Sequence, residues 1–124
     1  MARAFIAETS KFRAAVLTEY CANRHIEVCC MTDARRLPEE ARAAAPDVLF
    51  LRDSLLEGRP ALLQELRSQP PLDRALVVII CGGKESVAQA AGADFVLSPS
   101  LALAHLDAIF GRLAELRGSK QAAD

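Results

Sequence analysis

The stretch Pro46-Asp47-Val48-Leu49-Phe50-Leu51-Arg52-Asp53 decides the fold of this chain. It holds an apolar run, 48–51, that has no helical period, follows a proline and ends at two adjacent opposite charges. A strand that is apolar on both faces is typical of the centre of a parallel sheet, because helices cover such a sheet on both sides. We therefore expect a buried strand at 48–51, with Arg52 and Asp53 at its carboxyl end.

A second stretch of the same kind, Ala75 to Cys81, is the most apolar of the chain and is rich in β-branched residues. It predicts another fully buried strand, which ends at Gly82-Gly83-Lys84. Shorter apolar segments predict three further strands, at residues 3–7, 26–31 and 95–97. Helical spacing and capping residues predict helices at 11–24, 38–45, 60–69 and 85–91, and a last one from Leu103 to Leu116.

Three of these helices carry apolar stripes that should face the sheet; in the helix at 60–69 the stripe is Leu62, Leu63 and Leu66. In the first helix, which Thr9 or Ser10 can cap, the stripe is Phe12, Val16, Leu17 and Tyr20. In the last helix it is Leu103, Leu106, Ile109, Phe110, Leu113 and Leu116. Pro46 should end the second helix and Pro70-Pro71 the third, Gly92 should close the fourth, and Ser98-Pro99-Ser100 should form a turn with a capping serine.

Strands and helices alternate five times, which predicts an α/β fold: a flavodoxin-like (βα)5 three-layer sandwich around a five-stranded parallel sheet. We expect one domain at 1–117, with 118–124 as a polar tail. A chain of 124 residues can bury enough surface to fold without a metal or disulfide.

Composition argues against several classes of protein. The 15 basic and 16 acidic residues are spread along the chain, so no basic face for nucleic acid and no polybasic segment for a membrane is expected. No apolar run approaches the roughly 18 residues of a membrane helix, and the amino-terminal segment turns polar at Glu8, so we expect a soluble, cytoplasmic protein. Cys21, Cys29, Cys30 and Cys81 lack paired metal-site spacing and are expected to be buried free thiols, and His25 is expected in a surface turn.

In parallel sheets of this kind, ligands and chemistry gather beyond the carboxyl ends of the strands. The residues at those ends are Glu8 and Thr9, Cys30 to Thr32, Arg52 and Asp53, Cys81 to Lys84, and Ser98. Gly82, Gly83 and Lys84 could present backbone N–H groups and a charge to an anion, but a tight strand-to-helix turn with a solvated lysine is the favoured interpretation. Cys81 has no evident route to His25 or His105, so we do not expect an enzyme.

The order and length of the elements resemble the receiver domain of bacterial two-component response regulators. The residues that carry the resemblance are Pro46 to Leu51 before the third loop, Gly92-Ala93-Asp94 before the fifth strand, and Pro99 directly after it. The resemblance covers almost the whole chain. It implies a site in which two acidic residues hold Mg²⁺, an aspartate accepts a phosphoryl group, and a hydroxyl residue and a lysine assist.

This sequence departs from that pattern at most chemical positions. The acidic pair falls on Glu8 and Thr9, the acceptor position on Arg52 with Asp53 one residue late, the hydroxyl position on Cys81 and the lysine position on Ser98. Pro99 persists, as does Phe95 at the family's aromatic switch position. The segment from Cys81 to Gly92 is also short for a receiver, which predicts a shortened fourth helix.

The resemblance therefore implies a degenerate, stand-alone pseudo-receiver that works by protein-protein interaction in two-component signalling, without a cofactor. In this interpretation Arg52 pairs with Glu8 and excludes Mg²⁺. Its partners would be a sensor histidine kinase or another signalling protein, with a homodimer left open. Two alternatives remain: a single-domain response regulator phosphorylated on Asp53 with Glu8 and Mg²⁺, if a bulge re-aims Asp53, and a small-anion or nucleotide binder at Gly82 to Lys84.

Overall fold

The computed structural model describes residues 2–56, 61–68, 70–82 and 92–123, with side chains up to Glu115. Its strands are β1 (Arg3–Ala7), β2 (Glu27–Cys30), β3 (Val48–Arg52), β4 (Leu76–Ile80) and β5 (Phe95–Leu97). Its α-helices are α1 (Lys11–Ala22), α2 (Leu37–Ala44), α3 (Leu62–Arg67) and α5 (Leu103–Ala123). Three short 3₁₀ helices join them: η1 (Ala34–Arg36), η2 (Asp53–Leu56) and η3 (Leu72–Arg74).

The described strands form one parallel sheet in the order β2-β1-β3-β4-β5. This is the flavodoxin-like order, so the predicted fold class is confirmed. The strand from the deciding stretch, β3, lies at the centre, where Phe50 pairs in register with Ile6 of β1 and Val78 of β4.

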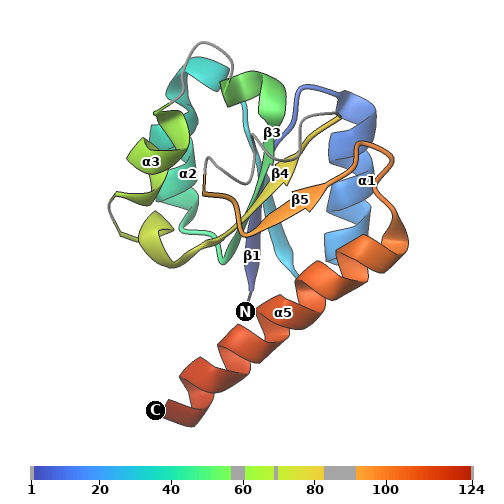
Figure 1. The fold of residues 1–124 in the computed structure, drawn as a ribbon, viewed down its shortest axis with the longest axis vertical. Helices are drawn as coiled ribbons and strands as arrows, with labels where there is room; N and C mark the ends of the chain where they lie inside the picture. The colour runs from blue at the N-terminus through green and yellow to red at the C-terminus, as the bar shows by residue number, and fades with distance from the viewer. Residues whose placement is uncertain (1, 57–60, 69, 83–91, 124) are drawn as a thin grey trace.

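Alternate residues of β3 point into two separate cores. Val48 and Phe50 pack in the core beneath α1 and α5, whereas Leu49 and Leu51 pack in the core beneath α2 and α3. Figure 1 shows the sheet with α2 and α3 on one side and α1 on the other. All four of these side chains are buried, so the prediction that helices cover both faces of this strand is confirmed.

Two residues of the predicted apolar stripes are exposed, contrary to expectation. Phe12 is 78% exposed, because it lies about 140° around α1 from Leu17, on which the buried face is centred. Leu103 is 66% exposed as the first residue of α5, and Leu101, two residues earlier, is buried in the α1–α5 core instead. The other described stripe residues of α5 are buried as expected: Leu106, Ile109, Phe110 and Leu113.

The chain's last helix runs to Ala123, so it extends through residues 118–123 of the segment that the sequence predicts as a polar tail. Its far end projects beyond the sheet in Figure 1. The predicted helix at 85–91, including its predicted shortening, lies outside the described residues. Gly92 has a φ of 98°, a conformation that glycine adopts without strain, as expected at the end of a helix. Within the described residues, no helix is both long and apolar enough to span a membrane.

The cysteines are free, but they are not all buried. Cys21 and Cys81 lie in the cores, Cys29 is half-buried and Cys30 is exposed, so the prediction of buried thiols is wrong for Cys30. The reason is that β2 is an edge strand, with β1 as its neighbour on one side. Burial raises the pKa of the Cys21 thiol to about 11, which leaves it protonated and unreactive near neutral pH.

Candidate functional site

The parallel register brings the carboxyl ends of β1, β3 and β4 to the same end of the sheet. Ala7, the last residue of β1, pairs with Leu51 of β3, and Arg52 pairs with Ile80 of β4. Glu8, Arg52 and Gly82 therefore follow or end neighbouring strands, as predicted. Ser98 follows Leu97, which pairs with Ile80.

The carboxylate of Glu8 is buried and already has partners. Its side chain has 0% exposure, and its Oε1 accepts hydrogen bonds from the backbone N–H of Ser10 (2.9 Å) and the hydroxyl of Thr9 (3.3 Å). Its Oε2 lies 3.2 Å from Nε of Arg13, at ion-pair distance but outside hydrogen-bond geometry. Ser10 caps α1 by accepting from the N–H of Arg13 at 3.3 Å, so the first turn of α1 brings Arg13 back toward Glu8.

The expected pair between Arg52 and Glu8 does not form, because each has another partner. Arg52 Nε lies 3.2 Å from Oδ1 of Asp53, and Glu8 pairs with Arg13, a residue that the sequence analysis did not include in the site. Arg13 carried a usable pattern, since it follows a capping serine by three residues and so shares the first turn of the helix with it.

Arg52 lies across the end of β4 with its side chain only 19% exposed. Its Nη2 is 4.0 Å from the position that a Cβ on Gly82 would take, and Cγ of Pro99 is 3.5 Å from the same position. The Nη1 atom of Arg52 is buried without a hydrogen-bond partner. One end of the guanidinium group thus lies close to Gly82, the second residue after β4.

Asp53 begins the 3₁₀ helix η2, directly after β3. The pairing of β3 with β4 is regular through Arg52 and Ile80, so the bulge that would re-aim Asp53 is absent from this ladder. The side chain of Asp53 has 35% exposure, and its carboxylate forms an ion pair with Arg52. Among the side chains that the structure describes, no three His, Cys, Asp or Glu residues are grouped closely enough to hold a metal ion.

The remaining predicted site residues make local contacts. Cys81 is buried in the α2–α3 core, while Ser98 shares a 3.0 Å hydrogen bond with the hydroxyl of Ser100. Phe95 is half-buried and packs against the α1–α5 core. Gly83 and Lys84 lie outside the described residues, so the predicted anion site is described only at Gly82.

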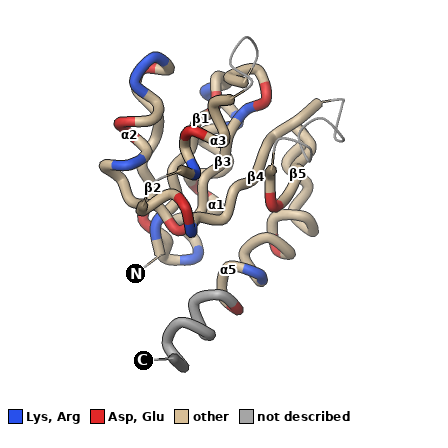
Figure 2. Tube along the Cα trace, turned by 60° about the vertical axis from the view of Figure 1, so that its left-hand side comes forward, with Lys and Arg blue, Asp and Glu red and all other residues tan. Residues whose placement is uncertain are grey.

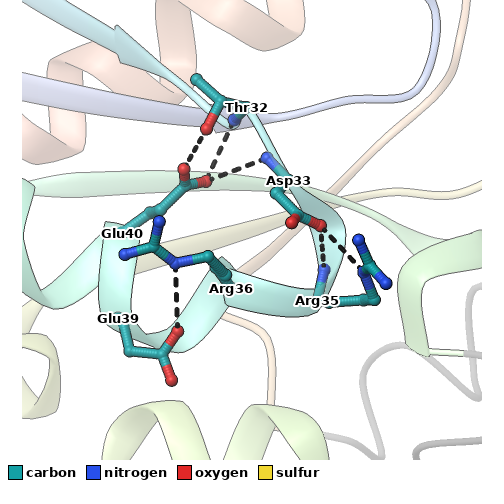
Figure 3. Close-up of polar contacts among 6 residues, drawn as sticks. All are labelled: Thr32, Asp33, Arg35, Arg36, Glu39 and Glu40. Carbon is teal, nitrogen blue, oxygen red and sulfur yellow. Dashed lines mark hydrogen bonds and ion pairs between the residues drawn. The ribbon is translucent and has the colours of Figure 1, made fainter.

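A second polar cluster, which the sequence analysis missed, holds the loop after β2 (Figure 3). The carboxylate of Glu40 in α2 accepts hydrogen bonds from the backbone N–H groups of Thr32 (3.0 Å) and Asp33 (3.3 Å), and from the Thr32 hydroxyl. Elsewhere on the chain acidic and basic residues are intermingled along the trace (Figure 2). The Glu39-Glu40 pair marks the first turn of α2 in the sequence, but the N–H groups that Glu40 binds belong to the loop after β2 and not to the helix.

The hydrogen bonds from Thr32 hold the pKa of Glu40 below its ordinary value of 4.5. Because the folded pKa is the lower one, Glu40 stabilises the fold fully above the ordinary value, and this stabilisation is lost as the pH falls below 4.5 through the folded pKa. We expect Glu40→Gln to lower the free energy of unfolding at pH 7 and to have a smaller effect at pH 3. Urea denaturation of both proteins at the two pH values measures this, and an equal difference at both would contradict it.

The strand order and the position of the site at the strand ends define a doubly wound, flavodoxin-like domain. Several solved receiver domains have closely similar structures. The signal receiver domain of a DNA-binding response regulator of Colwellia psychrerythraea 34H matches with a TM-score of 0.79 at 20% identity, over 93% of this chain and 99% of that one. A CheY-like receiver domain of Methylobacillus flagellatus matches with a TM-score of 0.76 at 20% identity, over 91% and 98%.

A third neighbour is the receiver domain of a sensor histidine kinase of Pseudomonas aeruginosa PAO1. It matches with a TM-score of 0.76 at 17% identity, over 90% of this chain and 96% of that one, and its structure has magnesium coordinated in the active site cleft. No protein-family model and no curated protein sequence matches the chain. At these identities the comparisons establish that the chain has the receiver fold.

Proposed function

We propose that this protein is a receiver-like member of a bacterial two-component pathway that acts by protein-protein contact and independently of aspartyl phosphorylation. The observation that carries the proposal is the guanidinium group of Arg52 at the end of β3, held by Asp53 and lying beside Gly82. This position is where the receiver pattern places its phosphoacceptor. A fixed positive charge there cannot act as the nucleophile toward a phosphoryl group.

The contacts of Glu8 support the same proposal. A carboxylate that is to bind Mg²⁺ needs free lone pairs directed at the metal. Glu8 instead directs one oxygen to Ser10 and Thr9 and the other to Arg13, with no side-chain exposure. In this proposal the receiver fold is retained as an interaction surface in the cytoplasm, no catalysis is required of it, and its Mg²⁺ site is replaced by an ion pair.

Phosphorylation of Asp53 with Glu8 and Mg²⁺ is the alternative that the test must separate from this proposal. It requires Asp53 to leave Arg52, and Glu8 to leave Arg13, before metal and phosphoryl donor can bind. An anion or nucleotide site at Gly82 to Lys84 is compatible with the positive charge of Arg52 beside Gly82. We rank both below the first proposal.

The proposal is tested by measuring binding to a purified sensor histidine kinase of the same organism by isothermal titration calorimetry. We expect binding whose affinity is the same in EDTA as in Mg²⁺ with acetyl phosphate. The matched variant Asp53→Asn should bind with the affinity of the unmodified protein. Binding that appears only with Mg²⁺ and the phosphoryl donor, and is lost in Asp53→Asn, would show that phosphorylation controls the interaction.

A further inference from the structure

Three arginines from three different elements line a hollow at the opposite end of the sheet from the candidate site. Arg67 comes from α3, Arg74 from η3 and Arg112 from α5, and the hollow has a volume of about 350 Å³. It lies at the amino ends of β4 and β5, where its lining is completed by Ala75, Leu76, Asp94 and Phe95. We call it the arginine hollow.

The negative charge within the arginine hollow is already neutralised. Asp94 is its acidic lining residue, and its Oδ2 accepts hydrogen bonds from Arg67 Nη1 (3.2 Å) and from the backbone N–H of Val77 (2.8 Å). Arg67 Nη1 also donates to the carbonyl oxygen of Gly92 at 2.9 Å. Arg67 and Asp94 therefore form a fixed wall that joins α3 to the segment before β5.

The other two arginines remain available to a ligand. Arg74 is exposed and forms no ion pair or side-chain hydrogen bond with any residue in the described part of the chain. Arg112 pairs with Glu115 at 3.2 Å, but both side chains are largely exposed, at 54% and 70%. Such exposed pairs contribute little energy and exchange readily for a stronger partner.

One competing interaction exists for Arg74. The same side chain also lines a neighbouring hollow that contains Asp47 and Asp73. An anion in the arginine hollow therefore competes with these carboxylates for the guanidinium group of Arg74. Arginine presents several donors in a rigid planar group, which suits oxyanions that can accept two hydrogen bonds at once.

We propose that the arginine hollow binds a small multivalent oxyanion, such as a polyphosphate or a polycarboxylate. Arg74 and Arg112 are its principal ligands, and Arg67 adds positive potential from the wall. A hollow of this size falls in the range of small-molecule sites, about 300–1,000 Å³. The inference does not rest on the proposed function, because it uses none of the residues at the carboxyl ends of the strands.

The test is a titration of the isotopically labelled protein with inorganic pyrophosphate, followed by the NMR shifts of backbone amides. We expect saturable shifts at Ala75, Leu76, Asp94 and Phe95. The variant Arg74→Gln should weaken binding about tenfold or more, since a charge-assisted hydrogen bond is lost. Because Arg74 is exposed and has no ion pair with another described residue, this variant should keep the wild-type fold, which the remaining amide shifts verify.

The control variant is Arg35→Gln, which removes an arginine with 91% side-chain exposure from a different part of the surface. It should bind pyrophosphate as the unmodified protein does. A parallel titration with citrate separates a general multivalent-anion site, which binds both probes, from one that prefers phosphate groups. Shifts at Gly82 in place of these amides, the absence of saturable shifts, or equal affinity in Arg74→Gln would each overturn the proposal.

Discussion

Phe50→Ala should lower the free energy of unfolding by about 3–5 kcal/mol, because it empties the centre of the α1–α5 core. Phe50 has no exposure and lies on the central strand β3, with its ring centroid 6.0 Å from that of Phe110 on α5. The loss is a large share of the roughly 5–15 kcal/mol by which a domain of this kind is stable. Urea denaturation followed by circular dichroism measures the effect.

The chain supplies a matched control in Phe12→Ala. It makes the same change in side chain at a position that is 78% exposed, so the expected change is within about 0.5 kcal/mol. If Phe50→Ala fails to fold, Phe50→Leu, which conserves most of the volume, should fold with a loss below about 1.5 kcal/mol. Equal effects of the two alanine substitutions would contradict the arrangement of α1 and β3 described above.

Arg13→Gln should lower the free energy of unfolding by about 2 kcal/mol, because it leaves the buried carboxylate of Glu8 without its ion-pair partner. We expect less than the full cost of breaking a buried pair, since the side chain of Arg13 is 27% exposed and water can reach it. Glu8 also keeps its hydrogen bond from Ser10 in this variant. The measurement is again urea denaturation at neutral pH.

A double-mutant cycle with Glu8→Gln isolates the pair itself. The double variant should be more stable than the sum of the two single losses predicts, with a coupling of about 1 kcal/mol or more. Arg35→Gln, which removes an arginine with 91% side-chain exposure, should change stability by less than about 0.5 kcal/mol. A loss in Arg13→Gln no greater than that in Arg35→Gln would contradict the buried ion pair.

The sheet was predictable because its strands are marked by local patterns. The apolar runs at 48–51 and 75–81 identify buried parallel strands without any knowledge of their neighbours, and both appear in the structure as β3 and β4. The orientation of the helices was less predictable. Phe12 has helical spacing to Val16 and Tyr20, but a row of residues spaced four apart moves gradually around the helix axis. Which part of that row is buried depends on how the helix packs on the sheet.

The residues of the candidate site were predictable, but their partners were not. A residue that ends or directly follows an apolar strand segment, such as Glu8 or Arg52, can be located from the sequence alone. Which charges pair depends on the path of the chain after each strand. The capped turn of α1 brings Arg13 to Glu8, and the start of η2 brings Asp53 to Arg52, so two local pairs form where one long-range pair was expected.

The central proposal is that the end of β3 does not accept a phosphoryl group. Incubation of the purified protein with acetyl phosphate and Mg²⁺, followed at once by intact-protein mass spectrometry, tests it most directly, with Asp53→Asn treated in parallel. We expect no phosphoryl adduct on either protein, since the proposed function assigns Arg52 to the acceptor position and Arg52 holds Asp53 in an ion pair. A stoichiometric adduct on the unmodified protein that is absent from Asp53→Asn would contradict the claim.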